Sequence, residues 1–79
     1  MEQEILEKGK SIHNEFSKKS FLFAILTFSI KLKEVDAVVN VSYFPTFFFI
    51  ITIDLLTFDT LRILIKHVVS YGEYEIYTL

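Results

Sequence analysis

The chain lacks cysteine and tryptophan, and it contains only two glycines and one proline in 79 residues. Without cysteine, neither a disulfide nor a thiolate metal site can form. Two glycines are too few for the glycine-rich loops that bind phosphate groups, which excludes the common nucleotide-binding motifs. The scarcity of glycine and proline also argues against a disordered linker. The chain therefore has to fold by burying apolar side chains.

A strong charge of either sign is also absent. Eight basic and ten acidic residues leave a net charge of −2. Nucleic-acid-binding surfaces are basic, so we expect no nucleic-acid partner. The apolar segments Ser20–Ile30 and Val41–Ile53 are each shorter than the roughly 20 residues that a membrane-spanning helix needs. The acidic start of the sequence does not resemble a secretory signal, so we expect a cytoplasmic protein, with membrane association as an alternative.

Apolar residues are abundant, at 52% of the chain, and nine Phe and four Tyr are among them. A domain of about 60 residues buries only ~60% of the surface that its unfolded chain exposes, so its stability is marginal. Small domains are often stabilised by disulfides, metals or oligomerisation. Oligomerisation remains here, and we expect a single α+β domain over residues 1–79 that forms a homo-oligomer, most simply a dimer, or binds a protein partner.

The spacing of apolar residues predicts an amphipathic helix over residues 3–19. Ile5, Ile12 and Phe16 fall on one helical face together with Gly9 and His13. Glycine in a helix interior costs about 1 kcal/mol relative to alanine. Its place on the apolar face therefore predicts a close approach to the surface beneath. The following residues, 21–25, fit either a continuation of this helix or the start of a strand.

Alternation of apolar and polar residues predicts an antiparallel three-strand meander after this helix. Its strands cover residues 26–33, 36–44 and 47–54, with turns at Glu34-Val35 and Pro45-Thr46. The third strand is apolar on both faces, which is typical of a strand in the interior of a sheet.

The last part of the chain predicts a second helix and a fourth strand. Thr57 or Asp59 is a suitable N-cap, and Gly72 suits the position after the helix. Residues 73–79 alternate as a strand. The order α-β-β-β-α-β then adds the fourth strand parallel to the third through a crossover helix. The helical stripe consists of Leu61, Leu64, Ile65 and Val68.

We predict no catalytic residue, metal or cofactor. An alternative is a metal-dependent hydrolase that uses Asp54, Asp59 and a glutamate at the end of the third strand, where ligands bind in open α/β sheets. Acidic residues there also fit helix capping and the helix dipole, which is the interpretation we favour. His13 and His67 have no spacing to a nucleophile, so any role would be that of a pH-sensitive contact.

Aromatic residues gather in the second and third strands and again near the end of the chain. Two helices cannot easily cover both faces of a four-stranded sheet in so short a chain, so an apolar sheet face is expected to remain for association. The last strand adds tyrosines, which are enriched at interfaces, and an edge for pairing. We therefore predict a non-catalytic protein-binding module of the inhibitor, antitoxin-like or accessory type. The predicted interface residues are Tyr43, Phe47, Phe48, Phe49, Tyr74, Tyr77 and Leu79.

Overall fold

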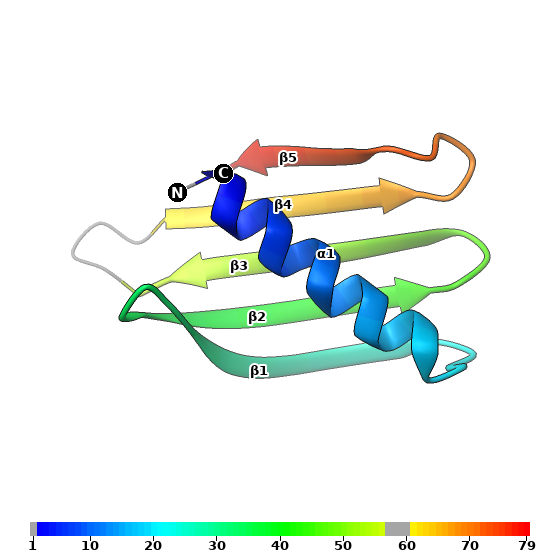
Figure 1. Cartoon of the computed structure of the whole chain (residues 1–79), viewed down its shortest axis with the longest axis horizontal. Coiled ribbons are helices and arrows are strands. Elements are labelled where there is room, and N and C mark those ends of the chain that lie inside the picture. Colours follow the sequence, from blue (N-terminus) through cyan, green and yellow to red (C-terminus); the bar gives the residue numbers. More distant parts are fainter. Residues whose placement is uncertain (1, 57–60) are drawn as a thin grey trace.

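One helix packs on one antiparallel sheet, in a computed structural model that describes residues 2–56 and 61–79 (Figure 1). Helix α1 spans Glu2–Lys18. Neighbouring strands pair antiparallel in chain order, so the sheet is a meander with β1 and β5 at its edges. Within the described ranges the strands are β1 (Ala24–Leu32), β2 (Val35–Phe44), β3 (Phe48–Leu55), β4 (Leu61–Val68) and β5 (Tyr74–Thr78).

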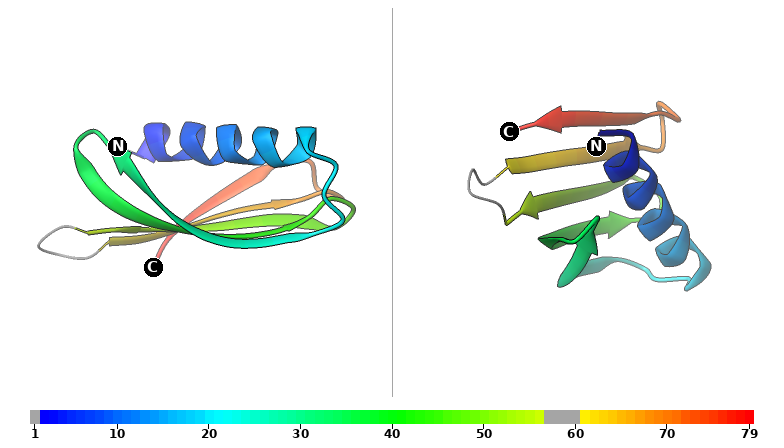
Figure 2. Two further views of the ribbon diagram at one scale, coloured as in Figure 1. Left: turned by 90° about the horizontal axis from the view of Figure 1, so that it is seen from below. Right: turned by 60° about the vertical axis from the view of Figure 1, so that its left-hand side comes forward.

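Helix α1 crosses one face of the sheet diagonally, from β4 and β5 at its start to β1 at its end (Figures 1 and 2). The predicted apolar stripe faces the sheet, with Ile5, Ile12 and Phe16 buried. The predicted close approach at Gly9 is confirmed. A Cβ atom built there would lie 2.6 Å from Ile65 Cδ1, so glycine lets the helix backbone approach β4 closely.

The core lies between α1 and the middle strands. Strand alternation sends every second side chain of β2, β3 and β4 toward the helix. Burial of a Val, Ile, Leu or Phe side chain contributes about 1.5–3 kcal/mol, so this layer is the main source of stability. Its centre consists of side chains that are at most 1% exposed: Ile5, Ala37, Val39, Val41, Phe49, Ile51, Ile53, Leu55 and Ile65.

The predicted antiparallel meander of the first three strands is confirmed, and β3 lies in the sheet interior between β2 and β4. The first turn is one residue earlier than predicted. Lys33 and Glu34 form it with φ values of 47° and 70°. Two consecutive residues with positive φ are the requirement of a tight two-residue hairpin turn. The ambiguous segment 21–25 follows the helix end, and its last two residues open β1.

The prediction of a second helix and a parallel fourth strand is wrong. Residues 61–68 form strand β4, which pairs antiparallel with β3. Ile63 and Ile65 are buried against the helix, whereas Leu64 and Val68 lie half-buried on the opposite face. Apolar residues lie on both faces of this strand, so their spacing in the sequence resembles the apolar stripe of a helix. The segment forms a strand because it pairs with the neighbouring apolar strand β3, and such tertiary context overrides local propensity.

Gly72 belongs to the turn between β4 and β5, where its φ of 71° is readily adopted only by glycine. The caps predicted at Thr57 and Asp59 lie outside the described residues. The last predicted strand is present as β5, antiparallel to β4.

Candidate binding face

The sheet face opposite α1, here called the open face, has no described helix or strand over it (Figure 2). It carries the alternate side chains that point away from the core. Ile50, Leu64 and Val68 on this face are only half-buried, and Ile25 is 68% exposed. Large contiguous apolar patches on a protein surface often mark binding sites.

The open face divides into an aromatic half and a polar half. The aromatic half lies at the β2–β3 turn and consists of Phe23, Ile25, Phe44, Phe47, Phe48, Ile50 and Val68. The polar half lies at the other end of the sheet. There the Thr27 hydroxyl donates to Asn40 Oδ1 at 2.8 Å, and Arg62 Nε donates to Asp54 Oδ1 at 2.7 Å. Polar side chains thus satisfy one another in one half, and apolar surface remains in the other.

Three phenylalanine rings form a continuous row in the aromatic half. Phe44 stands opposite Phe48 across β2 and β3, with 4.9 Å between ring centroids. Phe23 stacks on the other side of Phe44 at 5.9 Å. Such aromatic pairs contribute about 0.5–1.5 kcal/mol beyond the area they bury, so the row holds its own geometry. It is a preformed apolar surface.

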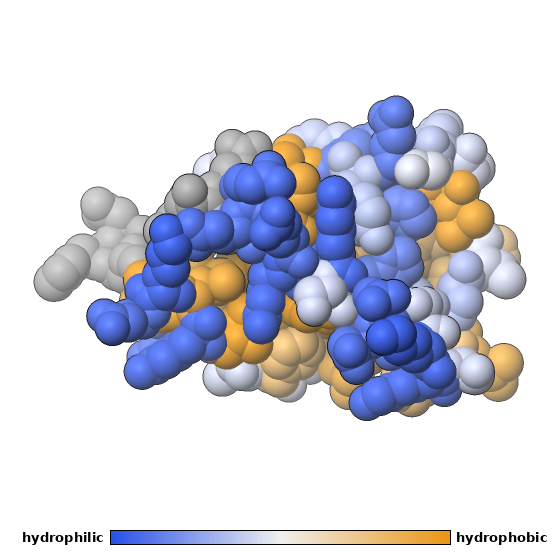
Figure 3. Space-filling view, viewed as in Figure 1, coloured by the Kyte–Doolittle hydropathy of each residue, from blue (hydrophilic) through white to orange (hydrophobic). Residues whose placement is uncertain are grey.

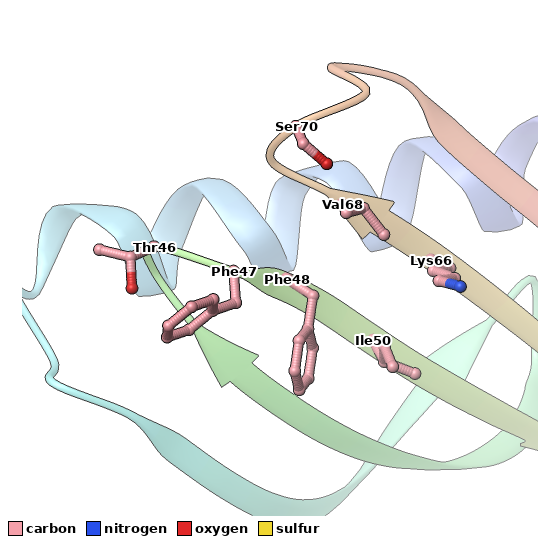
Figure 4. Close-up of a pocket in the computed structure, with 7 residues that line it drawn as sticks. All are labelled: Thr46, Phe47, Phe48, Ile50, Lys66, Val68 and Ser70. Carbon is pink, nitrogen blue, oxygen red and sulfur yellow. The ribbon is translucent and has the colours of Figure 1, made fainter.

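A groove of about 460 Å³ opens beside this row, between the start of β3 and the end of β4 (Figure 4). Its volume lies in the range of about 300–1,000 Å³ typical of binding pockets. Lys66 is the charged side chain among its lining residues, so an occupant with apolar groups and one acceptor or carboxylate would fit it. The lining residues are Thr46, Phe47, Phe48, Ile50, Lys66, Val68 and Ser70.

Four predicted interface residues divide between the groove and the core. Phe47, which is 67% exposed, and Phe48 line the groove. Tyr43 and Phe49 are 4% and 0% exposed, so they pack beneath α1 and lie out of reach of a partner. Tyr43 shares a strand face with Val41, whose burial decides the direction of both side chains.

The two predicted residues nearest the C-terminus are exposed. Tyr77, at 47% exposure, lies opposite Leu64 on the open face, and Leu79 is 65% exposed. The Tyr77 hydroxyl donates to the Glu75 carboxylate, and this hydrogen bond raises the pKa of Tyr77. Both residues lie on the β5 side of the sheet, away from the phenylalanine row.

Tyr74 belongs to a different cluster, on the helix side of the sheet. Its hydroxyl lies 2.5 Å from His13 Nδ1 and forms a hydrogen bond that joins α1 to β5. The Tyr74 ring also stacks on His67, with 4.5 Å between centroids, and Lys10 Nζ lies over its face. Tyr74 therefore anchors the helix, and both histidines meet at this anchor.

The His13 imidazole is enclosed by aromatic rings. It stacks on Phe49 at 4.6 Å and lies 5.0 Å from His67. Burial lowers the pKa of His13, and the charge of a protonated His67 lowers it further. The two imidazole planes are tilted by 47°, His13 Nδ1 is already bonded to Tyr74, and within the described residues no third possible ligand joins the pair to hold a metal ion. Protonation of His13 is therefore disfavoured while the helix is docked.

The hydrolase alternative finds little support around Asp54. One of its carboxylate oxygens already accepts the bond from Arg62. Glu75 pairs with Lys66, four residues along β4 from Arg62, which corresponds to roughly 13 Å. Asp59 lies outside the described residues, and the remainder of the chain holds no group of three His, Asp or Glu side chains arranged for a metal ion.

On the helix side, hydrophilic side chains gather over α1, and hydrophobic ones emerge beside it (Figure 3). No helix within residues 2–56 and 61–79 combines the length and the apolar character needed to cross a bilayer.

The sequence prediction missed one exposed apolar segment, at the start of β1. Phe21, Leu22, Phe23, Ile25 and Leu26 are all exposed. The ambiguity of residues 21–25 concealed them, because neither a helix nor a strand assignment fixed their direction. The available signal was the run of large apolar residues itself, directly after the helix-ending lysines.

The chain matches no protein-family model, no curated protein sequence and no solved structure.

Proposed function

We propose that this protein is a small non-catalytic binding module that recognises a protein partner through the aromatic half of its open face. The observation that carries the proposal is the row Phe23–Phe44–Phe48 beside the groove, an ordered apolar surface with exposed Phe47 at its rim. Aromatic side chains are enriched at the centres of protein interfaces, where they supply most of the binding energy.

The chemistry of the groove suggests the kind of partner. Its walls are mostly apolar, and Lys66 supplies one cation. A partner that inserts an apolar side chain next to a carboxylate would satisfy both features. The partner is a second copy of the chain or another protein, and the inhibitor, antitoxin-like and accessory roles all use such a contact.

Site-specific photo-cross-linking tests the proposal. A photoreactive phenylalanine analogue replaces Phe47, which is already exposed and aromatic, and a matched control replaces Arg62, which is exposed in the polar half and lies away from the β1 edge. We expect one discrete protein adduct from position 47 and none from position 62. Phe48→Lys should abolish the adduct while the circular dichroism spectrum is retained. Equal adducts at both positions, or an adduct that survives Phe48→Lys, would refute the proposal.

A further inference from the structure

We infer that a second copy of this chain docks along the outer edge of β1 and extends the sheet across a two-fold axis. The inference rests on the proposed binding role and adds to it a contact surface for a second copy, next to the aromatic half. Among the described residues, β1 pairs with β2 alone. The backbone N–H and C=O groups on its other side are therefore available, and such an edge readily pairs with another strand.

Apolar side chains accumulate at this edge. Leu22 is 91% exposed, Phe23 60% and Ile25 68%, and Phe21 and Leu26 are exposed as well. Proteins usually protect an exposed edge strand with charged residues near its centre. In β1 the one charge is Lys31, close to the end of the strand, so the first half of the edge is unprotected.

The opposite edge fits a second copy less well. Strand β5 has five residues against nine in β1. The Tyr77 hydroxyl donates a hydrogen bond to the exposed Glu75, so a negative charge lies on the open face of β5. Two β5 strands side by side would bring their glutamates together, and like charges on neighbouring strands are destabilising.

Side-chain parity and charge restrict how two β1 strands can pair. Parallel in-register pairing would bring Lys31 next to its own copy, which is unfavourable. Antiparallel pairing centred on Leu26 places Lys31 near Phe21 of the second copy and Ile25 near Thr27. Residues that face each other then point to the same side of the extended sheet. Both helices therefore lie on one side of that sheet, and both open faces lie on the other.

A hollow beside Leu26 supports a pairing of the two β1 strands that is centred on this residue. It has a volume of about 120 Å³ and lies between α1 and β1, lined by Glu15, Phe16, Lys19, Phe21 and Leu26. A two-fold axis through Leu26 brings the hollows of both copies together, with room for the two leucine side chains. The acid Glu15 and the base Lys19 on each rim can then form reciprocal pairs, since a two-fold contact matches residue i with j and j with i.

The absence of cysteine makes a cross-linking test direct, because each variant contains a single thiol. Directly opposed residues in an antiparallel pair have Cα atoms about 4.5–5.5 Å apart, which suits a disulfide. Under mild oxidation, Leu26→Cys should give a covalent dimer. In Lys31→Cys the two thiols would be ten strand positions apart, roughly 33 Å, and the chain should stay monomeric on a non-reducing gel.

Light scattering during size-exclusion chromatography supplies the second readout. The unmodified chain should have twice its 9.3 kDa mass, and Ile25→Lys should return it to one chain. Ile25 is exposed, so this variant should keep its circular dichroism spectrum. A single-chain mass for the unmodified protein, or equal cross-linking of both cysteine variants, overturns the inference. The adduct at position 47 reports separately on the proposed function, so the two failures are distinguishable.

Discussion

Gly9 offers a sharp test of how α1 packs on the sheet. Replacing it by alanine gains about 1 kcal/mol of helix propensity. The new methyl group would lie 2.6 Å from Ile65 Cδ1, inside a side chain that is fully buried. Overpacking of this kind costs about 1–3 kcal/mol. We therefore expect Gly9→Ala to change the free energy of unfolding by between zero and about −2 kcal/mol.

Ile65→Val removes the Cδ1 atom and isolates the cause. Alone, it should destabilise the protein by about 0.5–1.5 kcal/mol. In its presence, the remaining neighbours of the alanine methyl are Ile51 Cγ2 and Ile65 Cγ2, both at 3.6 Å, which is ordinary contact. Gly9→Ala should then stabilise the protein by about 1 kcal/mol. The double-mutant cycle should show a favourable coupling of about 1–3 kcal/mol.

Urea unfolding followed by circular dichroism measures the four free energies. Gly72→Ala is the control, because no atom lies within 4 Å of its added Cβ and its cost should come from the positive φ alone. That cost should add to the effect of Ile65→Val. Additivity of Gly9→Ala and Ile65→Val within about 0.5 kcal/mol would refute the close-approach explanation.

Three further predictions concern the helix anchor, the first turn and the polar half. The pKa of His13 is lowered in the folded state, so the contribution of His13 to stability is complete above its unfolded pKa of 6.5 and is lost as the pH falls below that value. The urea midpoint of the protein should therefore drop in acid, and His13→Phe should flatten that drop. An unchanged slope in the variant would contradict this. Glu34→Gly should raise the free energy of unfolding by roughly 1 kcal/mol, since glycine relieves the backbone strain of a φ of 70°. The control Glu73→Gly should not raise it, and equal effects of the two variants would exclude relief of strain. Asp54→Asn should lower the free energy of unfolding by less than about 1 kcal/mol, as expected for a partly exposed ion pair with Arg62. A larger loss in thermal unfolding would indicate that the pair acts as a buried one.

Local patterns predict the first half of this fold well. The helix stripe around Ile5 and Ile12 has a clear period of 3.6, and the strands after it alternate. Local patterns fail at β4, where Leu64 and Val68 are apolar although they lie on the open face. Those side chains contribute to the exposed apolar face, so the feature that misled the secondary-structure prediction is itself part of the candidate site.

The candidate site was predicted in part. An apolar sheet face left uncovered was expected, and Phe47 and Phe48 lie on it. The prediction that Tyr43 and Phe49 are interface residues is wrong, because both lie on the core face of their strands. Tyr43 lies on the same strand face as the buried Val41, so strand alternation itself indicates an inward direction. The His13–Tyr74 bond joins residues 61 positions apart, and no local pattern reveals such a contact.

The meander has a consequence for the order of folding. Each hairpin joins strands adjacent in the chain, so the sheet can grow by local steps, which favours rapid folding. Helix α1 is different, since its contacts reach β4 and β5 through Gly9 and His13. On a ribosome α1 emerges before the strands, but it cannot dock fully until β5 has formed. Until then both sheet faces are exposed, which favours aggregation of the nascent chain.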